Sequence, residues 1–247
     1  MNVVAVIPAR YGAQRLPGKP LADLLGKPMI QWVYEGARRA KTPSQFIIAT
    51  DDARIEAAAR AFGARVVMTS SDIQSGTDRV AAVADQVPAD VYVNVQGDEP
   101  LIEGEIIDRA VELVTSGRFR MSTLMTPLRT LEELRNPAVV KVIADRESRA
   151  LYFSRHPIPY SRIPEPPVGQ PFISRRHLGL YVYTRDLLNE LRKVPPCDLE
   201  RAESLEQLRA LEQGVAIGIS EVQSQSIGVD MPEDLETVRN LLKARMK

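Results

Sequence analysis

The sequence predicts an α/β fold with a mostly parallel central sheet flanked by helices, and two observations predict it. In the first half of the chain, short runs rich in β-branched residues alternate with amphipathic stretches of helical spacing. An unusual polar loop follows each of these runs, as at the carboxyl ends of strands in open α/β sheets. The 247 residues suffice for one substantial core, so we expect a single domain over residues 1–247.

The first half is expected to contain four strands, with stretches of helical pattern between and after them. The strands are expected at residues 3–7, 46–50, 66–69 and 91–95. The helices are expected at residues 29–40, 53–62, 77–86 and 104–115. Because ligands of open parallel sheets collect at the carboxyl ends of strands, a site is expected in the loops that follow these four strands.

The second half departs from this alternation. Its strands are expected at residues 121–128, 139–144, 151–155, 178–183 and 215–222, and its helices at residues 201–213 and 232–244. A proline-rich stretch, HPIPYSRIPEPPVGQP, begins at His156 and excludes a regular helix. We interpret residues 150–185 as an insertion that serves acceptor binding or dimerisation.

Composition excludes several classes of partner. Lysine plus arginine and aspartate plus glutamate both number 32, so no net charge favours nucleic acid or an anionic membrane. The apolar segment at residues 3–8 is too short for a signal-peptide core or a membrane span, and we expect a cytoplasmic protein. The single cysteine, Cys197, excludes an intrachain disulfide and a cysteine-based zinc cluster. His156 and His177 lack the spacing of metal ligands.

The loop after the first strand, IPARYGAQRLPGKP, holds three cations, Arg10, Arg15 and Lys19. It is not a Walker A motif, because five residues separate its two glycines and a proline follows the lysine. A strand end with three cations and free backbone donors suits a polyphosphate. The alternative is a solvated basic loop, although solubility alone does not explain its glycines and prolines.

Carboxylates follow the expected strand at residues 91–95, in the sequence VNVQGDEP. Asp98 could carry Mg²⁺ toward phosphates held by the first loop, since hard cations prefer oxygen ligands. A second candidate ligand is Asp230 in GVDMPEDLE, where an extended segment enters a helix. The alternative for both is a role in a turn or a helix cap.

Other strand exits also leave two interpretations open. The segment QSGTDR offers hydroxyl groups, a glycine and Arg79, which could read the polar edge of a base or simply begin a helix. Asp51 and Asp52 follow the second strand and could be helix caps or part of a site. Further along, the His177 side chain could face a pocket or pack in the core.

The chain resembles the 3-deoxy-manno-octulosonate cytidylyltransferases, also called CMP-Kdo synthetases, in seven segments that occur in the family's order and spacing. These segments are IPARYGAQRLPGKPL, QSGTDR, VNVQGDEP, LYFSR, HLGLYVY, SLEQLR and GVDMPEDLE. The resemblance implies a Rossmann-like nucleotidyltransferase fold and a homodimer. It also implies transfer of CMP from CTP to the anomeric hydroxyl of Kdo, with release of pyrophosphate, for lipopolysaccharide biosynthesis.

The resemblance implies site residues as well. Those on the nucleotide side are Ala9, Arg10, Arg15, Lys19, Ser75, Gly76 and Arg79. The implied magnesium ligands are Asp98 and Asp230. The residues implied near the sugar acid are Gln96, Arg155, His177, Tyr183, Glu206 and Gln207. Those expected to act in catalysis are Arg10, Arg15, Lys19 and Asp98.

Physical chemistry makes this assignment coherent. Attack on the α-phosphate needs neutralised phosphate charge and in-line placement of the leaving pyrophosphate. No protein base stands out, so we expect the metal to lower the pKa of the attacking hydroxyl. The alternatives are an acceptor such as 8-amino-Kdo or another sugar acid, a metal-dependent glycosyltransferase, and a non-catalytic nucleotide-binding regulator on the same fold.

Overall fold

The computed structural model describes residues 1–12, 16–73, 75–162, 172–224, 226–229 and 231–245. The chain divides into two compact units. The first comprises residues 1–108 together with residues 225–247, and the second comprises residues 109–224. The division falls within helix α4 (Gly104–Thr115). No helix in the described part of the chain is both long and apolar enough to cross a membrane.

The first unit is built on a parallel sheet, as the sequence predicts. Its strands, in spatial order, are β6 (Val91–Asn94), β1 (Val3–Ala9), β4 (Gln45–Thr50) and β5 (Arg65–Met68). Every neighbouring pair is parallel, with Val6 of β1 in register with Ile47 of β4 and Asn94 of β6. The register places the carboxyl ends of β1 and β6 side by side.

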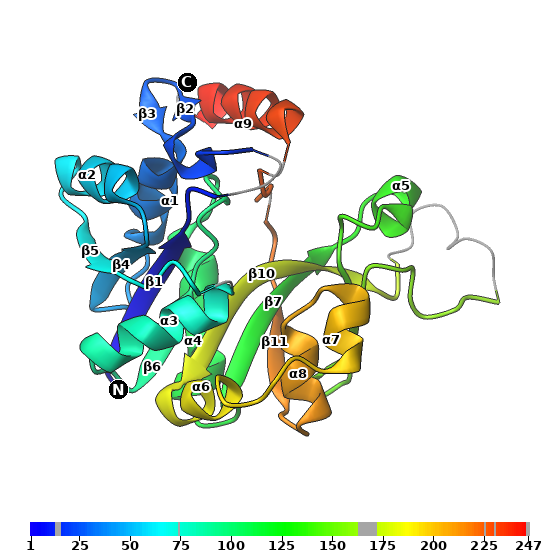
Figure 1. Cartoon of the computed structure of the whole chain (residues 1–247). Coiled ribbons are helices and arrows are strands. Elements are labelled where there is room, and N and C mark those ends of the chain that lie inside the picture. Colours follow the sequence, from blue (N-terminus) through cyan, green and yellow to red (C-terminus); the bar gives the residue numbers. More distant parts are fainter. Residues whose placement is uncertain (13–15, 74, 163–171, 225, 230, 246–247) are drawn as a thin grey trace. The chain divides into compact units, whose positions relative to one another are not determined.

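Helices connect these strands. They are α1 (Met29–Ala37), α2 (Ala53–Ala61) and α3 (Gly76–Gln86), and Figure 1 shows α3 in front of the sheet. From β1 the chain proceeds outward to β4 and β5, and then returns to β6 on the other side of β1. Since parallel crossovers are right-handed, this reversal makes the gap between β1 and β6 the topological switch point, where open α/β sheets bind ligands.

Smaller elements complete the first unit. A 3₁₀ turn, η1 (Lys19–Leu21), leads into a short hairpin of β2 (Asp23–Leu24) and β3 (Lys27–Pro28), which the sequence analysis did not anticipate. Helix α9 (Pro232–Arg245) lies beside this hairpin (Figure 1). Its buried face joins the hairpin and α1 in an apolar cluster formed by Leu24, Met29, Leu101, Val229, Leu235, Val238 and Leu242. Through this cluster, the segment after β6 and the segment before α9 pack against the hairpin that follows the loop after β1.

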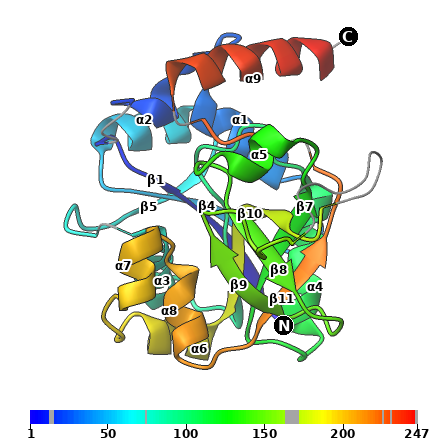
Figure 2. The ribbon, with the colours of Figure 1, turned by 90° about the vertical axis from the view of Figure 1, so that its right-hand side faces the viewer.

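The second unit has a mixed sheet. Strand β7 (Met121–Pro127) pairs in parallel with β11 (Ile217–Glu221) and antiparallel with β10 (Arg175–Thr184). Strand β8 (Lys141–Ala144) pairs antiparallel with β10 and with β9 (Ala150–Ser154), and Figure 2 shows β8 and β9 side by side. A register shift in β10 lies between Leu178 and Tyr181.

Four short helices accompany this sheet: α5 (Leu131–Arg135), α6 (Arg185–Leu191), α7 (Asp198–Glu203) and α8 (Gln207–Glu212). The prediction of one helix over residues 201–213 is wrong. The helix breaks at Ser204, whose φ of 52° is left-handed, and the chain restarts as α8. Helices α5 and α6 were not predicted, although threonines cap both of them, Thr130 and Thr184.

Candidate active site

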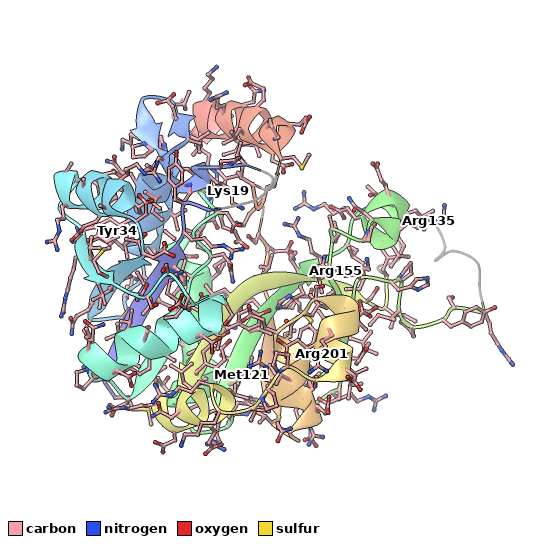
Figure 3. The ribbon with its side chains drawn as sticks, viewed as in Figure 1. Lys19, Tyr34, Met121, Arg135, Arg155 and Arg201 are labelled. Atoms are coloured by element: carbon pink, nitrogen blue, oxygen red, sulfur yellow. The ribbon has the colours of Figure 1, made fainter. Side chains whose placement is uncertain are left out.

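Lys19 and Asp98 form an ion pair at the switch point of the first unit. The Lys19 ammonium, labelled in Figure 3, lies 2.7 Å from Asp98 Oδ2 and 2.7 Å from the Val229 carbonyl oxygen. The Val229 amide in turn donates to the Asp98 carbonyl at 2.9 Å. The loop after β1, the loop after β6 and the segment before α9 therefore meet around one cation and one carboxylate.

A glycine permits this convergence. A β-carbon placed on Gly97 would lie 2.3 Å from the Pro8 carbonyl oxygen, which is too close for any other residue. The loop that carries Asp98 therefore passes directly against the end of β1. Ala9 is the buried last residue of β1, the exposed Arg10 follows it, and the half-buried Gln96 lies two residues beyond the end of β6. Two of the predicted site residues, Arg15 and Asp230, lie outside the described residues.

The amino end of α3 meets β6 close to the same switch point. Ser75 caps the helix, because its hydroxyl accepts from the Asp78 amide at 3.0 Å and donates to the Asp78 carboxylate at 2.8 Å. A β-carbon on Gly76 would lie 3.4 Å from Asn94 Nδ2. Asn94 is buried, and its Oδ1 has no hydrogen-bond partner among the described residues. Since such an acceptor is costly to bury unpaired, Asn94 is a candidate ligand contact that the sequence analysis missed.

Arg79 is held by protein groups. Its side chain is 3% exposed and donates to Asp51 Oδ2 at 3.0 Å, to the Ile73 carbonyl at 3.0 Å and to the Thr69 hydroxyl. These partners come from the loops after β4 and β5, so Arg79 ties the two loops together. Its predicted contact with cytidine stays a prediction. Asp51, for which the sequence left a site role open, is the partner that neutralises Arg79.

Asp52 caps α2, which confirms the capping alternative for this residue. Its carboxylate accepts from the Arg54 amide at 2.9 Å and from the Arg54 guanidinium at 3.0 and 2.7 Å. The guanidinium hydrogen bonds, foremost, lower the pKa of the Asp52 carboxyl to about 2. The Arg54 guanidinium also lies 3.3 Å from the centre of the Tyr11 ring. The sequence pattern did not single out either Arg54 or Tyr11.

In the second unit, Arg155, labelled in Figure 3, directly follows β9 and donates hydrogen bonds to backbone carbonyls. It donates to Glu203 O at 2.7 Å and to Pro137 O at 3.0 Å. The Glu203 carboxylate accepts from the Ser154 hydroxyl at 2.6 Å and from the Arg155 amide at 2.8 Å. The fully buried Lys141 donates to three carbonyls of the same region, and burial lowers the pKa of its ammonium. Arg155 therefore lies in a network that fixes the start of the predicted insertion.

His177 is buried in the second unit, at 8% exposure. Its Nε2 lies 2.8 Å from the Thr123 hydroxyl, and its ring packs edge-on against Phe153 at 4.9 Å between centroids. Burial lowers the pKa of the imidazole to about 3, so it is neutral near pH 7. A neutral imidazole can orient a polar ligand by hydrogen bonding but does not supply a positive charge.

A second neutral pair lies beside His177. Tyr181 lies 5.5 Å from the His177 ring centre and donates from its hydroxyl to Gln207 Oε1 at 2.9 Å. Gln207 is buried, and its Nε2 has no partner among the described residues. Tyr183 is buried and stacks on Tyr181 at 6.2 Å, while the neighbouring Glu206 is exposed. The second unit thus brings His177, Tyr183 and Gln207 together, and Tyr181 is a residue that the sequence analysis missed.

The fold is that of an α/β protein whose parallel sheet brings a lysine, a carboxylate and a helix amino end to its switch point, where open α/β sheets bind ligands. A family model described as cytidylyltransferase matches residues 4–217. The chain belongs to this cytidylyltransferase family.

Relatives of known name match almost the whole chain. A 3-deoxy-manno-octulosonate cytidylyltransferase of Geobacter sulfurreducens is 51% identical over 250 residues, covering 98% of this chain and 100% of the relative. Another protein of that name, from Bdellovibrio bacteriovorus, is 47% identical and covers 99% of each chain. A solved structure of a CMP:2-keto-3-deoxy-manno-octonic acid synthetase complexed with CTP has a TM-score of 0.92 and 43% identity, covering 99% of this chain and 100% of the solved chain.

Proposed function

We propose that this protein transfers CMP from CTP to the anomeric hydroxyl of Kdo, giving CMP-Kdo and pyrophosphate for lipopolysaccharide biosynthesis. The proposal rests on one observation: about half of the residues are identical, over nearly the full chain, to relatives of that name. A close structural neighbour that holds CTP supports it. In the reaction, the anomeric oxygen attacks the α-phosphorus. The bond from that phosphorus to the bridging oxygen breaks, and pyrophosphate leaves.

The first unit supplies the groups for the nucleotide. Lys19, with Arg10 and Arg15, is proposed to neutralise the triphosphate, since all three follow the end of β1. Ala9, Ser75, Gly76 and Arg79 are proposed to form the cytidine side. For Arg79 we propose an indirect role, because Asp51, Thr69 and Ile73 already bind its guanidinium.

We further propose that the reaction depends on Mg²⁺ held by Asp98 and Asp230. The chemistry of the donors fits, because Asp98 Oδ2 and the Val229 carbonyl both accept from the Lys19 ammonium at 2.7 Å, so cation-binding oxygens already converge there. A bound Mg²⁺ supplies charge neutralisation and lowers the pKa of a hydroxyl near it. The chain's own contribution is to hold the Asp98 carboxylate at the switch point and the lysine beside it.

The second unit is proposed to bind the sugar acid through Arg155, His177, Tyr183, Glu206 and Gln207. Gln96, which the family resemblance also implies near the sugar acid, belongs to the first unit. The buried Gln207 Nε2 supports this proposal, because it presents N–H donors to which Kdo hydroxyl or carboxylate oxygens could bind. The neutral His177 imidazole can act as a donor or acceptor beside it.

We also propose that the protein is a cytoplasmic homodimer, in which each chain forms one cytidylyltransferase domain. Exposed apolar side chains within residues 150–185 support a role of this segment in dimerisation, namely Leu151 at 56%, Tyr160 at 90% and Ile173 at 75% exposure. Sedimentation equilibrium tests the dimer, with twice the chain mass of 27.4 kDa expected. A single species at the mass of one chain would contradict it.

Pyrophosphate release tests the reaction. Each of the four nucleoside triphosphates is combined with Kdo, 8-amino-Kdo and sialic acid, with Mg²⁺ present or removed by a chelator. We expect release only with CTP, greatest with Kdo, lost on chelation and restored by added Mg²⁺. No release from CTP with any of the acids overturns the enzyme assignment, and full activity in chelator overturns the magnesium proposal alone.

A further inference from the structure

We propose that Arg54 is a positioning residue for the two ends of the nucleotide loop, at Arg10 and Lys19, and that it acts through its contact with the Tyr11 ring. This inference rests on the proposed function, because its effect is measured as binding of CTP. Arg54 lies in the first turn of α2 and Tyr11 lies at the start of the loop, so a crossover helix and the loop meet through one guanidinium and one ring.

The loop is closed at its base. The Gly18 amide donates to the Tyr11 carbonyl at 3.0 Å, which joins its two ends. Gly18 has a φ of 70°, and a β-carbon on it would lie 3.1 Å from the Tyr11 ring. The Tyr11 side chain therefore contacts the far end of the loop as well as Arg54. Arg10 immediately precedes this closure and Lys19 immediately follows it, so the closure sets the spacing of both cations.

Arg54 is itself fixed on the other side. Its guanidinium makes a two-point contact with the Asp52 carboxylate, which also caps α2. This contact holds the guanidinium carbon over the Tyr11 ring, 3.3 Å from its centre. Cap, guanidinium and ring form a chain of contacts from α2 to the loop. Removing the guanidinium frees the Tyr11 ring, so Tyr11 must be ordered when CTP binds.

A different role for Arg54 would be direct binding of phosphate. The Asp52 carboxylate argues against it, because it neutralises the guanidinium and occupies two of its donors. The two roles predict opposite signs for Asp52→Asn. Asparagine still caps the helix, so α2 is retained. A phosphate ligand released from its carboxylate would strengthen CTP binding, whereas a positioning residue that has lost its anchor would weaken it.

Calorimetric titration of the full chain with CTP and Mg²⁺, without sugar acid, tests the inference. We expect Arg54→Ala to raise the Kd for CTP about twofold to fivefold, as expected for loss of a solvent-exposed cation–π contact. Asp52→Asn should raise the Kd by a smaller factor, and Tyr11→Phe should leave it unchanged because the ring remains. Arg60→Ala is the matched control, since Arg60 pairs with Glu56 on the same helix.

A double-mutant cycle completes the test. If Arg54 acts through Tyr11, the Tyr11→Leu/Arg54→Ala variant binds CTP no more weakly than Tyr11→Leu alone. The inference is overturned if the effects of the two changes multiply, or if Asp52→Asn binds CTP more tightly. It is also overturned if Arg54→Ala and Arg60→Ala have equal Kd values. Thermal unfolding of every variant checks that the fold is retained. A wild-type chain that binds no CTP would instead refute the proposed function.

Discussion

The two units hold their candidate site residues by different physical means. In the first unit the side chains are charged and paired: Lys19 with Asp98, and Arg79 with Asp51. In the second unit the central side chains are neutral and buried, with His177 on Thr123 and Tyr181 on Gln207. A triphosphate and a metal ion require fixed charge, whereas a polyhydroxy acid is distinguished by the direction of its hydrogen bonds. The contrast is the one expected if the first unit binds CTP and the second binds the sugar acid, as proposed.

The largest effect is expected when the Asp98 carboxylate of the first unit loses its negative charge. Asp98→Asn keeps the shape of the side chain but replaces the carboxylate proposed to bind Mg²⁺ by a neutral amide, so we expect kcat to fall at least about 100-fold. Steady-state pyrophosphate release measures it, with the exposed Glu105→Gln as the control. If Asp98→Asn keeps the wild-type rate with Mg²⁺, the reaction does not need the negative charge of Asp98.

Next in size is the buried ion pair of the same unit. Arg79→Ala leaves the Asp51 carboxylate without its cation, and we expect the free energy of unfolding to fall by about 3 kcal/mol. Urea denaturation measures the change. The exposed pair Arg109–Glu112 supplies a control, because Arg109→Ala should cost no more than about 0.5 kcal/mol. Equal effects of the two changes would show that Arg79 does not hold its loops.

The neutral pair of the second unit should affect the acceptor and not the nucleotide. Tyr181→Phe removes the hydroxyl that orients Gln207, and we expect KM for Kdo to rise about tenfold with KM for CTP unchanged. Tyr92→Phe is a matched control in the first unit, since that buried hydroxyl donates to the Val87 carbonyl. Its loss should lower stability without raising KM for Kdo. A rise in KM for CTP with Tyr181→Phe would contradict the division of roles.

The smallest effect concerns pH. The folded His177 pKa of about 3 lies below the ordinary value of about 6.5, so only the unfolded chain takes up this proton as pH falls. His177 therefore lowers the free energy of unfolding as pH falls from about 6.5 toward 3, and by about 0.7 kcal/mol between pH 7 and pH 6.

Carboxylates hardly titrate in that interval, so denaturation at the two pH values can isolate the histidine. His177→Asn should lack this contribution, whereas the same change at the exposed His156 should leave it in place. If wild type and His177→Asn have the same pH dependence, the imidazole does not become buried in its neutral form.

Local patterns predicted much of the first unit. Strand and helix positions there follow from periodicity, and the polar loops were predicted to follow the strands because the carboxyl ends of parallel strands share one edge of the sheet. The cap role of Asp52 was among the predicted alternatives, because Asp52 lies in one of these loops. The break at Ser204 was not foreseen, because a left-handed residue other than glycine leaves little trace in the sequence pattern.

The sequence by itself determined the residue types of the site: cations after the first strand, carboxylates after the fourth, and the motifs that the family shares. Only the tertiary structure decided which of these side chains pair, because pairing depends on contacts between segments far apart in the chain. Lys19 meets Val229 across 210 positions, Arg79 is neutralised by Asp51, and Tyr181 orients Gln207. Periodicity reports the environment of one segment at a time, so contacts of this range leave no local signal.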